Sequence, residues 1–279
     1  MPILHAIILG LVQGLSEFLP ISSSGHLLLV PWLFRWNDFD GRANIEKAFD
    51  VALHLGTLIA VVGYFRHELV VYVREGIRLV AKREKPANAQ GRLAWLLVMS
   101  ALPAAAVGAV LEKTIDDKLG TPLLIAISLI FFGVLLAWAD RRAGQRVLDD
   151  YTRADAAKVG LAQVLALNPG TSRSGITMTA ARFLGFTRDA AARASFLMAI
   201  PVTAGAVAFK MLKLVKDGIP DGLVVPMIMG IVTAGVSGWL AVWGTLKLVR
   251  TRSFMPFVVY RVGLGGLVLL LIATGVRSR

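Results

Sequence analysis

The fold of this 279-residue chain is decided by two stretches that match each other: GLVQGLSEFLPISSSG at residues 10–25 and GLAQVLALNPGTSRSG at residues 160–175. They align without a gap at a shift of 150 positions, and both begin with glycine, leucine, one variable residue and glutamine. The match at the turn sets Ser22, Ser24 and Gly25 against Ser172, Ser174 and Gly175. A weaker match sets Phe49 and Ala52 against Phe196 and Ala199. The sequence therefore predicts an internal repeat.

Each of these stretches interrupts a segment that is otherwise apolar. Residues 2–30 carry proline, hydroxyl residues and glycine from Pro20 to Gly25, and residues 159–184 carry the same residue types from Pro169 to Gly175. A continuous helix should not contain such a run at membrane depth, because non-helical backbone is tolerated there only inside protein or beside a watery cavity. We therefore predict two re-entrant helical hairpins, each entering and leaving on the same side of a membrane.

The composition indicates an integral membrane protein. Hydrophobic residues make up 56% of the chain and charged residues 17%, with a mean hydropathy of +0.67, whereas soluble domains carry about 25% charged residues. The formal charge of +12 indicates basic cytoplasmic loops and no nucleic-acid partner, because no basic stretch is interleaved with aromatic residues that could stack on bases. The chain has no cysteine, which excludes a thiol nucleophile.

Six further apolar stretches are candidates to cross a bilayer, which takes about 17–25 residues. They cover residues 48–65, 93–111, 122–139, 194–209, 223–246 and 254–276. With both termini outside, the inside loops hold 18 of the 30 basic residues and the outside loops hold 10, which favours this orientation. The predicted fold is an all-α polytopic membrane protein with a single domain, residues 1–279. Its six transmembrane helices and two re-entrant hairpins form an inverted-topology repeat with halves of roughly 1–139 and 140–279.

Glu17 and Arg173 form the centre of the predicted site. An ionisable side chain at membrane depth is energetically expensive and indicates function. Arg173 lies in the other hairpin, and its planar guanidinium suits phosphate or carboxylate. The hairpins add the polar residues Ser22, Ser23, Ser24, His26, Ser172, Ser174 and Thr177. Because Gly25 and Gly175 allow close approach of the backbone and helix N-termini attract anions, we expect a phosphate site. The alternative is that the serines only cap broken helices.

Two other parts of the chain carry polar residues in apolar surroundings. Asp50 and His54 lie four residues apart and share a helix face, so they either line the mouth of the cavity or lie solvated at the membrane interface. Arg261 lies inside the last apolar stretch. We expect it to snorkel to the cytoplasmic interface, as long basic side chains do near helix ends.

The motifs GLVQGLSEFLPISSSGH at residues 10–26 and NPGTSRSGIT at residues 168–177 together resemble the bacterial undecaprenyl-diphosphate phosphatase family, also called bacitracin-resistance proteins. The similarity covers essentially the whole chain. The family's serine-rich motif matches residues 22–26, and its Pro-Gly-x-Ser-Arg-Ser-Gly-x-Thr motif matches residues 169–177, including Gly170. Many members have glutamate where this chain has Gln13, which weakens a metal-binding role at that position.

The resemblance implies a homodimer in the bacterial inner membrane, with its active site facing the periplasm or the exterior. It implies removal of the terminal phosphate from undecaprenyl diphosphate, a polyprenyl diphosphate lipid, which returns the lipid carrier to peptidoglycan synthesis and confers bacitracin resistance. It also implies a divalent cation, Mg²⁺ or Ca²⁺, for which Glu17 is the candidate ligand.

The residues alone leave the attacking group open. Either Ser23 attacks phosphorus with His26 as general base, or His26 attacks and forms a phosphohistidine. Glu17 would then orient His26 or hold the metal, while Arg173 and the backbone N–H groups of the hairpins hold the phosphoryl group. Ser172, Ser174 and Thr177 would complete this phosphate cradle. Transport of the lipid carrier is the competing function, because inverted repeats with broken helices also build transporters.

Overall fold

A computed structural model describes residues 1–39, 42–81, 89–217 and 222–277, and within these ranges the only regular elements are helices. The α-helices are α1 (Ile3–Phe18), α2 (Ser23–Phe34), α3 (Ala43–Tyr64), α4 (Arg66–Ala81), α5 (Ala89–Lys118), α6 (Pro122–Asp140), α7 (Arg153–Val164), α8 (Arg173–Phe183), α9 (Arg188–Asp217), α10 (Val224–Val249) and α11 (Met255–Ala273). Short 3-10 helices, η1 (Leu148–Asp150) and η2 (Leu165–Leu167), flank α7. One isolated bridge joins Arg146 to Phe186. The all-α prediction is therefore confirmed for the described residues.

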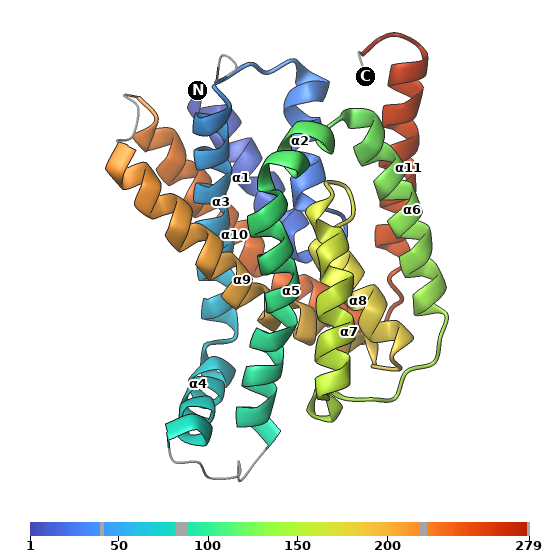
Figure 1. Ribbon diagram of the computed structural model, residues 1–279. Coiled ribbons are helices and arrows are strands. Elements are labelled where there is room, and N and C mark those ends of the chain that lie inside the picture. The colour runs from blue at the N-terminus through green and yellow to red at the C-terminus, as the bar shows by residue number, and fades with distance from the viewer. Residues whose placement is uncertain (40–41, 82–88, 218–221, 278–279) are drawn as a thin grey trace.

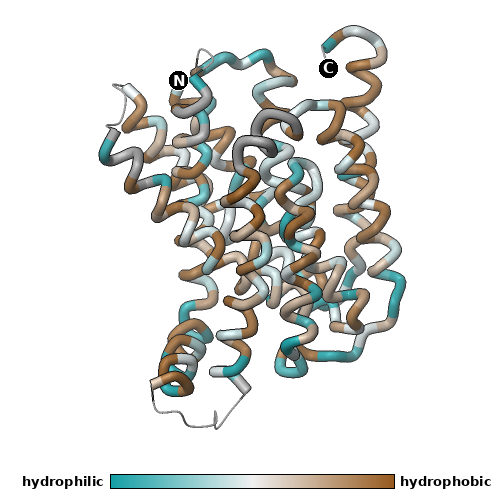
Figure 2. Tube along the Cα trace, in the orientation of Figure 1, coloured by the Kyte–Doolittle hydropathy of each residue, from teal (hydrophilic) through white to brown (hydrophobic). Residues whose placement is uncertain are grey.

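Within the described ranges, five helices, α5, α6, α9, α10 and α11, contain segments long and apolar enough to cross a membrane. The pair formed by α3 and α4 is a sixth candidate, with a bend of 82° between the two helices. Figure 2 shows hydrophobic residues along the middle of the long helices and hydrophilic residues in the connections at the ends of the bundle. These features identify a multi-pass membrane protein, because apolar side chains that face outwards need a lipid environment.

Two pairs of helices, α1–α2 and α7–α8, form hairpins whose turns lie inside the bundle. In Figure 1, α1 and α2 descend from the end where both chain termini lie, whereas α7 and α8 rise from the opposite end. The first hairpin packs mainly through α1 on α10, and the second packs through α7 on α5 and through α8 on α6 and α9. The two predicted breaks therefore lie within the protein interior.

The glycines that begin the two repeated stretches allow the first helix of each hairpin to pack closely on a long helix. A Cβ atom at Gly10 would lie 2.5 Å from the carbonyl oxygen of Gly230 in α10. A Cβ atom at Gly160 would lie 2.7 Å from the carbonyl oxygen of Ser100 in α5. Since the opposing atoms are backbone and cannot move aside cheaply, glycine at both positions determines how deeply each hairpin sits.

Candidate active site

Each hairpin turns at a serine that has the same unusual backbone conformation. The φ angle is 79° at Ser22 and 75° at Ser172, a region that residues other than glycine rarely adopt. The Ser22 hydroxyl accepts a hydrogen bond from the N–H of Gly25 at 3.3 Å, and the Ser172 hydroxyl accepts one from the N–H of Gly175 at 3.0 Å. Both serines therefore cap the helix that follows. Strained backbone of this kind is found where surrounding structure holds it, often at functional sites.

Direct hydrogen bonds join the two turns to each other. The Ser22 hydroxyl also accepts from the N–H of Gly170, at 3.0 Å. The Ser174 hydroxyl donates to the carbonyl oxygen of Leu19, at 3.0 Å. These hydroxyl groups satisfy backbone atoms that the broken helices leave without helical partners. Part of the predicted phosphate cradle therefore holds the hairpins together.

Arg261 in α11 binds both turns, and its position corrects the expectation from sequence. The residue is 0% exposed. Its Nη1 atom donates to the carbonyl oxygen of Pro20 at 3.0 Å, and its Nη2 atom donates to those of Gly170 and Thr171 at 2.9 and 3.0 Å. Its Nε atom donates to the carbonyl oxygen of Leu129 at 3.1 Å. The prediction that Arg261 snorkels to the interface is wrong, because a guanidinium has five donors and the turns supply unpaired carbonyl groups.

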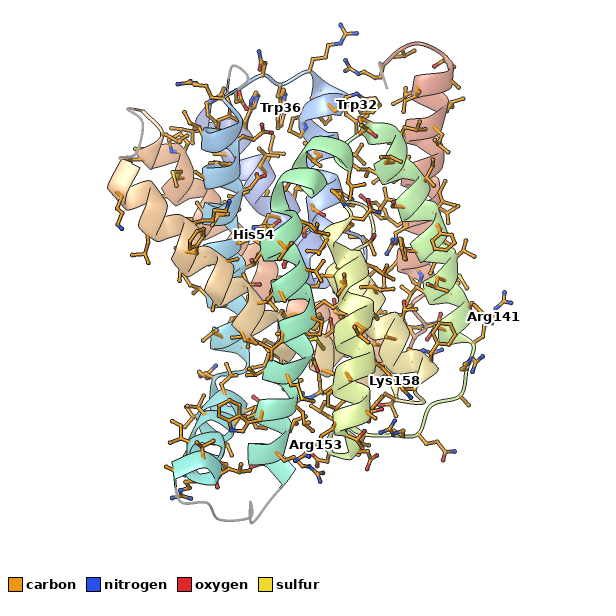
Figure 3. All side chains as sticks on the ribbon, in the orientation of Figure 1. Trp32, Trp36, His54, Arg141, Arg153 and Lys158 are labelled. Carbon is orange, nitrogen blue, oxygen red and sulfur yellow. The ribbon has the colours of Figure 1, made fainter. Side chains whose placement is uncertain are left out.

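A cavity of about 250 Å³ lies beside the turns, between the hairpins, α3 and α9. Its walls combine polar residues of the hairpins with mainly apolar residues of the long helices: Glu17, Ser23, Ser24, Val51, His54, Ala166, Ser172, Arg173, Val202, Thr203, Ala206 and Val207. Figure 3 shows His54 between the end of the bundle that carries Trp32 and Trp36 and the end that carries Arg153. The cavity therefore lies within the apolar part of the bundle.

Glu17 accepts hydrogen bonds from both hairpins. Its Oε1 atom lies 2.8 Å from Nη2 of Arg173, and its Oε2 atom accepts from the Ser23 hydroxyl at 2.5 Å and from Nε2 of Gln13 at 3.1 Å. The Nε2 atom of His54 is 3.7 Å from Oε2. The structure therefore shows the predicted pairing of Glu17 with Arg173. It also brings Ser23 and His54 to the same carboxylate.

Arg173 retains an unused donor at the cavity. The side chain is 18% exposed, yet its Nη1 atom is buried and has no hydrogen-bond partner among the described residues. A buried donor without a partner is energetically costly. An anionic group in the cavity would satisfy this nitrogen, so the arrangement favours a ligand such as phosphate.

Ser23 and His26 have different partners. Ser23 lines the cavity and donates to Glu17. The His26 ring is buried, and its Nδ1 atom donates to the carbonyl oxygen of Ser22 at 2.7 Å, so a neutral ring accepts at Nε2 from the Tyr260 hydroxyl, also at 2.7 Å. The two rings are stacked, with centroids 5.6 Å apart. The structure therefore brings Ser23 together with Glu17 and places His26 against Tyr260.

The other predicted site residues lie either on the cavity or in the structure that supports it. Ser24 and Ser172 line the cavity. Thr177 is buried and donates to a serine of α9. His54 lines the cavity, and its Nδ1 atom donates to the main-chain oxygen of Asp50 at 2.8 Å. The residues that form or brace the turns are Ser22, Gly25, Gly170, Ser174 and Gly175.

Comparison with known proteins places the chain in a family. The family described as "Bacitracin resistance protein BacA" matches residues 6–267. The chain belongs to this family. It is 48% identical over 271 residues to the "Undecaprenyl-diphosphatase" of Geobacter sulfurreducens, which covers 96% of this chain and 98% of that protein. It is 48% identical to the protein of the same name from Pelobacter propionicus, over 99% of both chains, and 45% identical to that of Moorella thermoacetica, over 96% and 97%.

Sequence reasoning missed one wall of the cavity of this BacA-family protein. Val202, Thr203, Ala206 and Val207 of α9 face the cavity, and none of them was predicted to do so. The available signal was Pro201, which lies inside α9, because proline within a helix removes a backbone hydrogen bond and bends the chain. A proline two residues before Thr203 in an apolar stretch therefore marked this part of α9.

The residues around the cavity suit a cation that is held mainly by substrate. Among the described residues, no three histidine, aspartate or glutamate side chains converge to hold a metal ion. Of the described residues that line the cavity, only Glu17 carries a carboxylate. Mg²⁺ usually binds one or two carboxylates together with substrate phosphates and water. One carboxylate beside the predicted phosphate site therefore fits such an ion.

Proposed function

We propose that this protein is an integral membrane phosphatase that hydrolyses undecaprenyl diphosphate to undecaprenyl phosphate and inorganic phosphate. The observation that carries the proposal is the Ser23 hydroxyl, 2.5 Å from the Glu17 carboxylate in a cavity that Arg173 also lines. A nucleophile, a base and an anion-binding group are the parts that phosphoryl transfer needs. The shared name of the relatives supports this substrate. The reaction recycles the lipid carrier for cell-wall synthesis and gives resistance to bacitracin.

The proposed reaction has two steps, both of which use Ser23 and Glu17. In the first step, the Ser23 oxygen attacks the terminal phosphorus, Glu17 accepts the hydroxyl proton, and the P–O bond of the anhydride breaks. Undecaprenyl phosphate leaves with that proton, and phosphoserine remains. In the second step, water attacks phosphorus while Glu17 takes its proton and passes it to the departing Ser23 oxygen. Inorganic phosphate is released, and a covalent intermediate thus divides one difficult step into two easier ones.

Arg173 holds the phosphoryl group during both steps. Its Nη1 atom lacks a protein partner, and the capped helix starts of α2 and α8 direct backbone N–H groups towards the turns. These donors stabilise negative charge as it develops on the phosphoryl oxygens. His26 supports the turn through its hydrogen bond to Ser22, and the Nε2 atom of His54 lies 3.7 Å from the Glu17 carboxylate.

A divalent cation, Mg²⁺ or Ca²⁺, is part of the proposal, with Glu17 as its protein ligand. When bound, such an ion neutralises charge on the diphosphate. The protein contributes the carboxylate, and the neighbouring Ser24 and Ser172 hydroxyls line the same cavity.

We further propose how the protein lies in the membrane. The spans are α3, α5, α6, α9, α10 and α11, and the hairpins α1–α2 and α7–α8 are re-entrant halves of an inverted repeat. The protein is a homodimer in the inner membrane, and the cavity opens to the periplasm. Val51, Val202 and Val207 give the cavity an apolar side along which the isoprenoid tail leaves towards lipid.

Purified protein in detergent tests the function directly. We expect release of inorganic phosphate from undecaprenyl diphosphate, and its absence would contradict the proposal. Because detergent micelles have no second leaflet, transport of lipid across a membrane cannot produce this signal.

We predict that Arg173→Lys lowers turnover nearly as much as Arg173→Ala. Lysine retains the positive charge, but it cannot pair with Glu17 through one nitrogen and bind phosphate through another in the plane of a guanidinium. The measurement is kcat for phosphate release from undecaprenyl diphosphate in detergent. Turnover near the wild-type value in Arg173→Lys would show that only the charge matters.

The orientation predicts that both termini are extracytoplasmic. A peptide tag placed after the last residue should be labelled in intact spheroplasts by a reagent that does not cross the membrane. Labelling that requires permeabilised membranes would contradict this topology. This result is independent of the phosphatase activity measured in detergent.

A further inference from the structure

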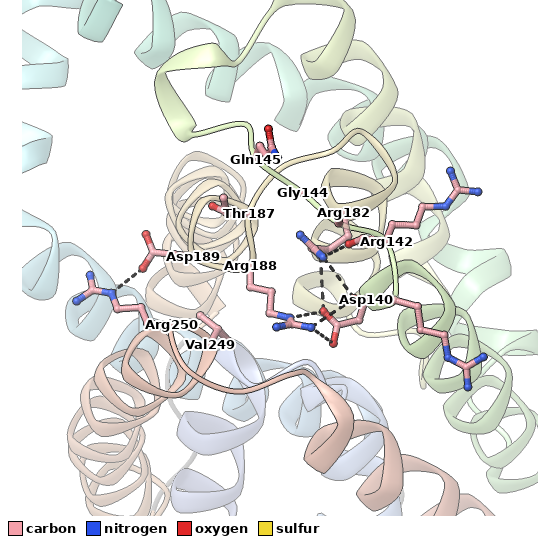
Figure 4. Close-up of a pocket in the computed structure, with 12 residues that line it drawn as sticks. Asp140, Arg142, Gly144, Gln145, Arg182, Thr187, Arg188, Asp189, Val249 and Arg250 are labelled. Atoms are coloured by element: carbon pink, nitrogen blue, oxygen red, sulfur yellow. Dashed lines mark hydrogen bonds and ion pairs between the residues drawn. The ribbon is translucent and has the colours of Figure 1, made fainter.

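A second cavity, of about 680 Å³, lies at the end of the bundle opposite to the chain termini. The end of α6, the end of α8, the start of α9 and the end of α10 surround it (Figures 1 and 4). Its lining residues are Asp140, Arg141, Arg142, Ala143, Gly144, Gln145, Arg182, Thr187, Arg188, Asp189, Val249 and Arg250. It shares no residue with the Glu17 cavity. Five arginines and two aspartates leave an excess of three positive charges around it.

Both carboxylates of this second cavity are already paired with arginine. Asp140 accepts from Nε of Arg188 at 2.6 Å and lies 3.6 Å from Nε of Arg182. Asp189 accepts from Nε of Arg250 at 2.8 Å. Figure 4 shows these pairs on separate sides of the cavity. Neither aspartate is therefore available to neutralise the remaining arginines.

Arg141 and Arg142 supply the charge that is left over. Both residues are exposed, and neither has a carboxylate within ion-pair distance among the described residues. The Arg142 guanidinium lies over the Phe183 ring, 5.1 Å from its centroid. Figure 4 shows the Arg142 backbone next to the Arg182 side chain. These two arginines are therefore placed at the cavity without a protein anion of their own.

The buried Arg182 side chain forms the base of the second cavity and is hydrogen-bonded to the surrounding backbone. Arg182 is 4% exposed, and its terminal nitrogens donate to the carbonyl oxygens of Phe186, at 2.5 Å, and of Arg142. A Cβ atom at Gly144 would lie 2.2 Å from the Phe186 carbonyl oxygen, so the connection after α6 packs directly on this base. At the start of α9, Thr187 accepts from a backbone N–H through its hydroxyl. The positive end of a long helix dipole therefore faces a preformed basic cavity.

The surroundings of the second cavity place it at the boundary of the membrane. Trp138, in the last turn of the apolar helix α6, is 57% exposed and packs edge-on against Phe183. Tryptophan at the end of an apolar helix is typical of the membrane–water interface. A basic cavity at this depth is within reach of lipid headgroups as well as of ions in solution.

We propose that this second cavity binds a phosphate-bearing anion, either the headgroup of an anionic phospholipid or free phosphate. The planar guanidinium groups of Arg141 and Arg142 suit phosphate oxygens, and bidentate pairing makes such contacts strong. Positive charge that only fixed the topology would need neither a cavity nor a buried arginine that is hydrogen-bonded at its base. The proposal does not depend on the phosphatase reaction.

The test uses two pairs of variants. The first pair removes positive charge inside the cavity or outside it, and the second pair changes one lining residue with or without adding a negative charge. Arg141→Gln/Arg142→Gln removes two lining charges, and Arg153→Gln removes an exposed charge at the same end of the molecule that does not line the cavity. Ala143→Glu places a carboxylate among the lining residues, and Ala143→Gln is its uncharged equivalent. Because these residues are exposed, all variants should fold.

Two probes distinguish the source of the phosphate. The first is phosphatidylglycerol in nanodiscs of phosphatidylcholine, with retained lipid counted by native mass spectrometry. The second is inorganic phosphate, titrated calorimetrically against protein in phosphatidylcholine nanodiscs. We expect Arg141→Gln/Arg142→Gln and Ala143→Glu to weaken binding of one probe about tenfold. The binding of both probes to Arg153→Gln and Ala143→Gln should stay within about twofold of wild type, because the first removes a charge outside the cavity and the second adds no charge to it.

Each outcome decides the proposal. Loss confined to phosphatidylglycerol identifies a lipid site, and loss confined to inorganic phosphate identifies a soluble anion site. Equal weakening by Arg153→Gln would show a general effect of surface charge and would overturn the proposal. Binding of both probes that is unchanged in Ala143→Glu would also overturn it. None of these results depends on turnover at Ser23.

Discussion

Ser23→Ala is expected to lower kcat for phosphate release from undecaprenyl diphosphate by at least about 10⁴-fold, because it removes the attacking atom itself. The hydroxyl of Ser23 is 2.5 Å from Glu17, so the substitution leaves the base without a proton to accept. Affinity for the diphosphate should stay near wild type, since Arg173 and the backbone donors remain. Rapid-quench experiments with labelled substrate should show a phosphoenzyme in wild type and none in Ser23→Ala.

The matched comparison for this prediction is His26→Ala. His26 bonds to Ser22 and Tyr260 and has no hydrogen bond to Ser23. Its loss should therefore loosen the turn and slow the reaction by about 10²-fold, at the lower end of what loss of a general base costs. The reverse order, with His26→Ala inactive and Ser23→Ala only slow, would establish attack by His26. If both variants keep more than a tenth of wild-type turnover, neither residue attacks.

Arg261→Met is expected to lower the free energy of unfolding by about 3–5 kcal/mol, because several buried carbonyl oxygens lose their donor and each such group costs about 1–3 kcal/mol. Methionine fills a similar volume but leaves the carbonyl oxygens of Pro20, Gly170 and Thr171 buried without a donor. Because those atoms belong to both turns, turnover should fall together with stability. Thermal denaturation in detergent measures the loss of stability, with the disappearance of the monodisperse peak as its readout.

Two further variants separate stability from charge. Arg252→Met removes an exposed arginine in the connection before α11 and should leave the transition unchanged. Arg261→Lys keeps the positive charge but offers three donors from one atom, so it should recover only part of the lost stability. Wild-type stability in Arg261→Met would contradict the role of this residue as the link between the turns.

Most of the fold could be predicted because it follows from hydropathy and from the repeat. Continuous apolar stretches give α6, α10 and α11 almost residue by residue, since backbone groups in lipid must pair within their own helix. The proline and serine runs gave the two breaks for the same reason. The bend of 82° between α3 and α4 was not predicted, because hydropathy reports length and composition but no direction.

The site could be predicted only in part because its pairings join distant residues. The link between Glu17 and Arg173 was accessible, since two opposite charges in two matching apolar segments have few other partners. The sequence could not show that the Ser23 hydroxyl donates to Glu17 and makes no hydrogen bond to His26. It depends on the side to which each residue points after the Ser22 cap, where φ is 79°. The position of Arg261 was not predicted because a lone arginine in an apolar helix gives no sign of carbonyl groups that lie 90 to 241 residues away in the sequence.

The shared cap and φ angle of Ser22 and Ser172 bear on the ancestry of the chain. A duplicated segment starts as two identical copies, and the matching turns preserve the scaffold of that ancestor. At the same shift of 150 positions, Ser23 in one copy stands opposite Arg173 in the other, and Glu17 stands opposite Leu167. In the proposed mechanism, one turn therefore supplies the attacking residue and the other supplies the residue that holds the anion, although nine of the sixteen aligned positions differ. Twin scaffolds of this kind let an enzyme evolve an asymmetric reaction without inventing a second fold.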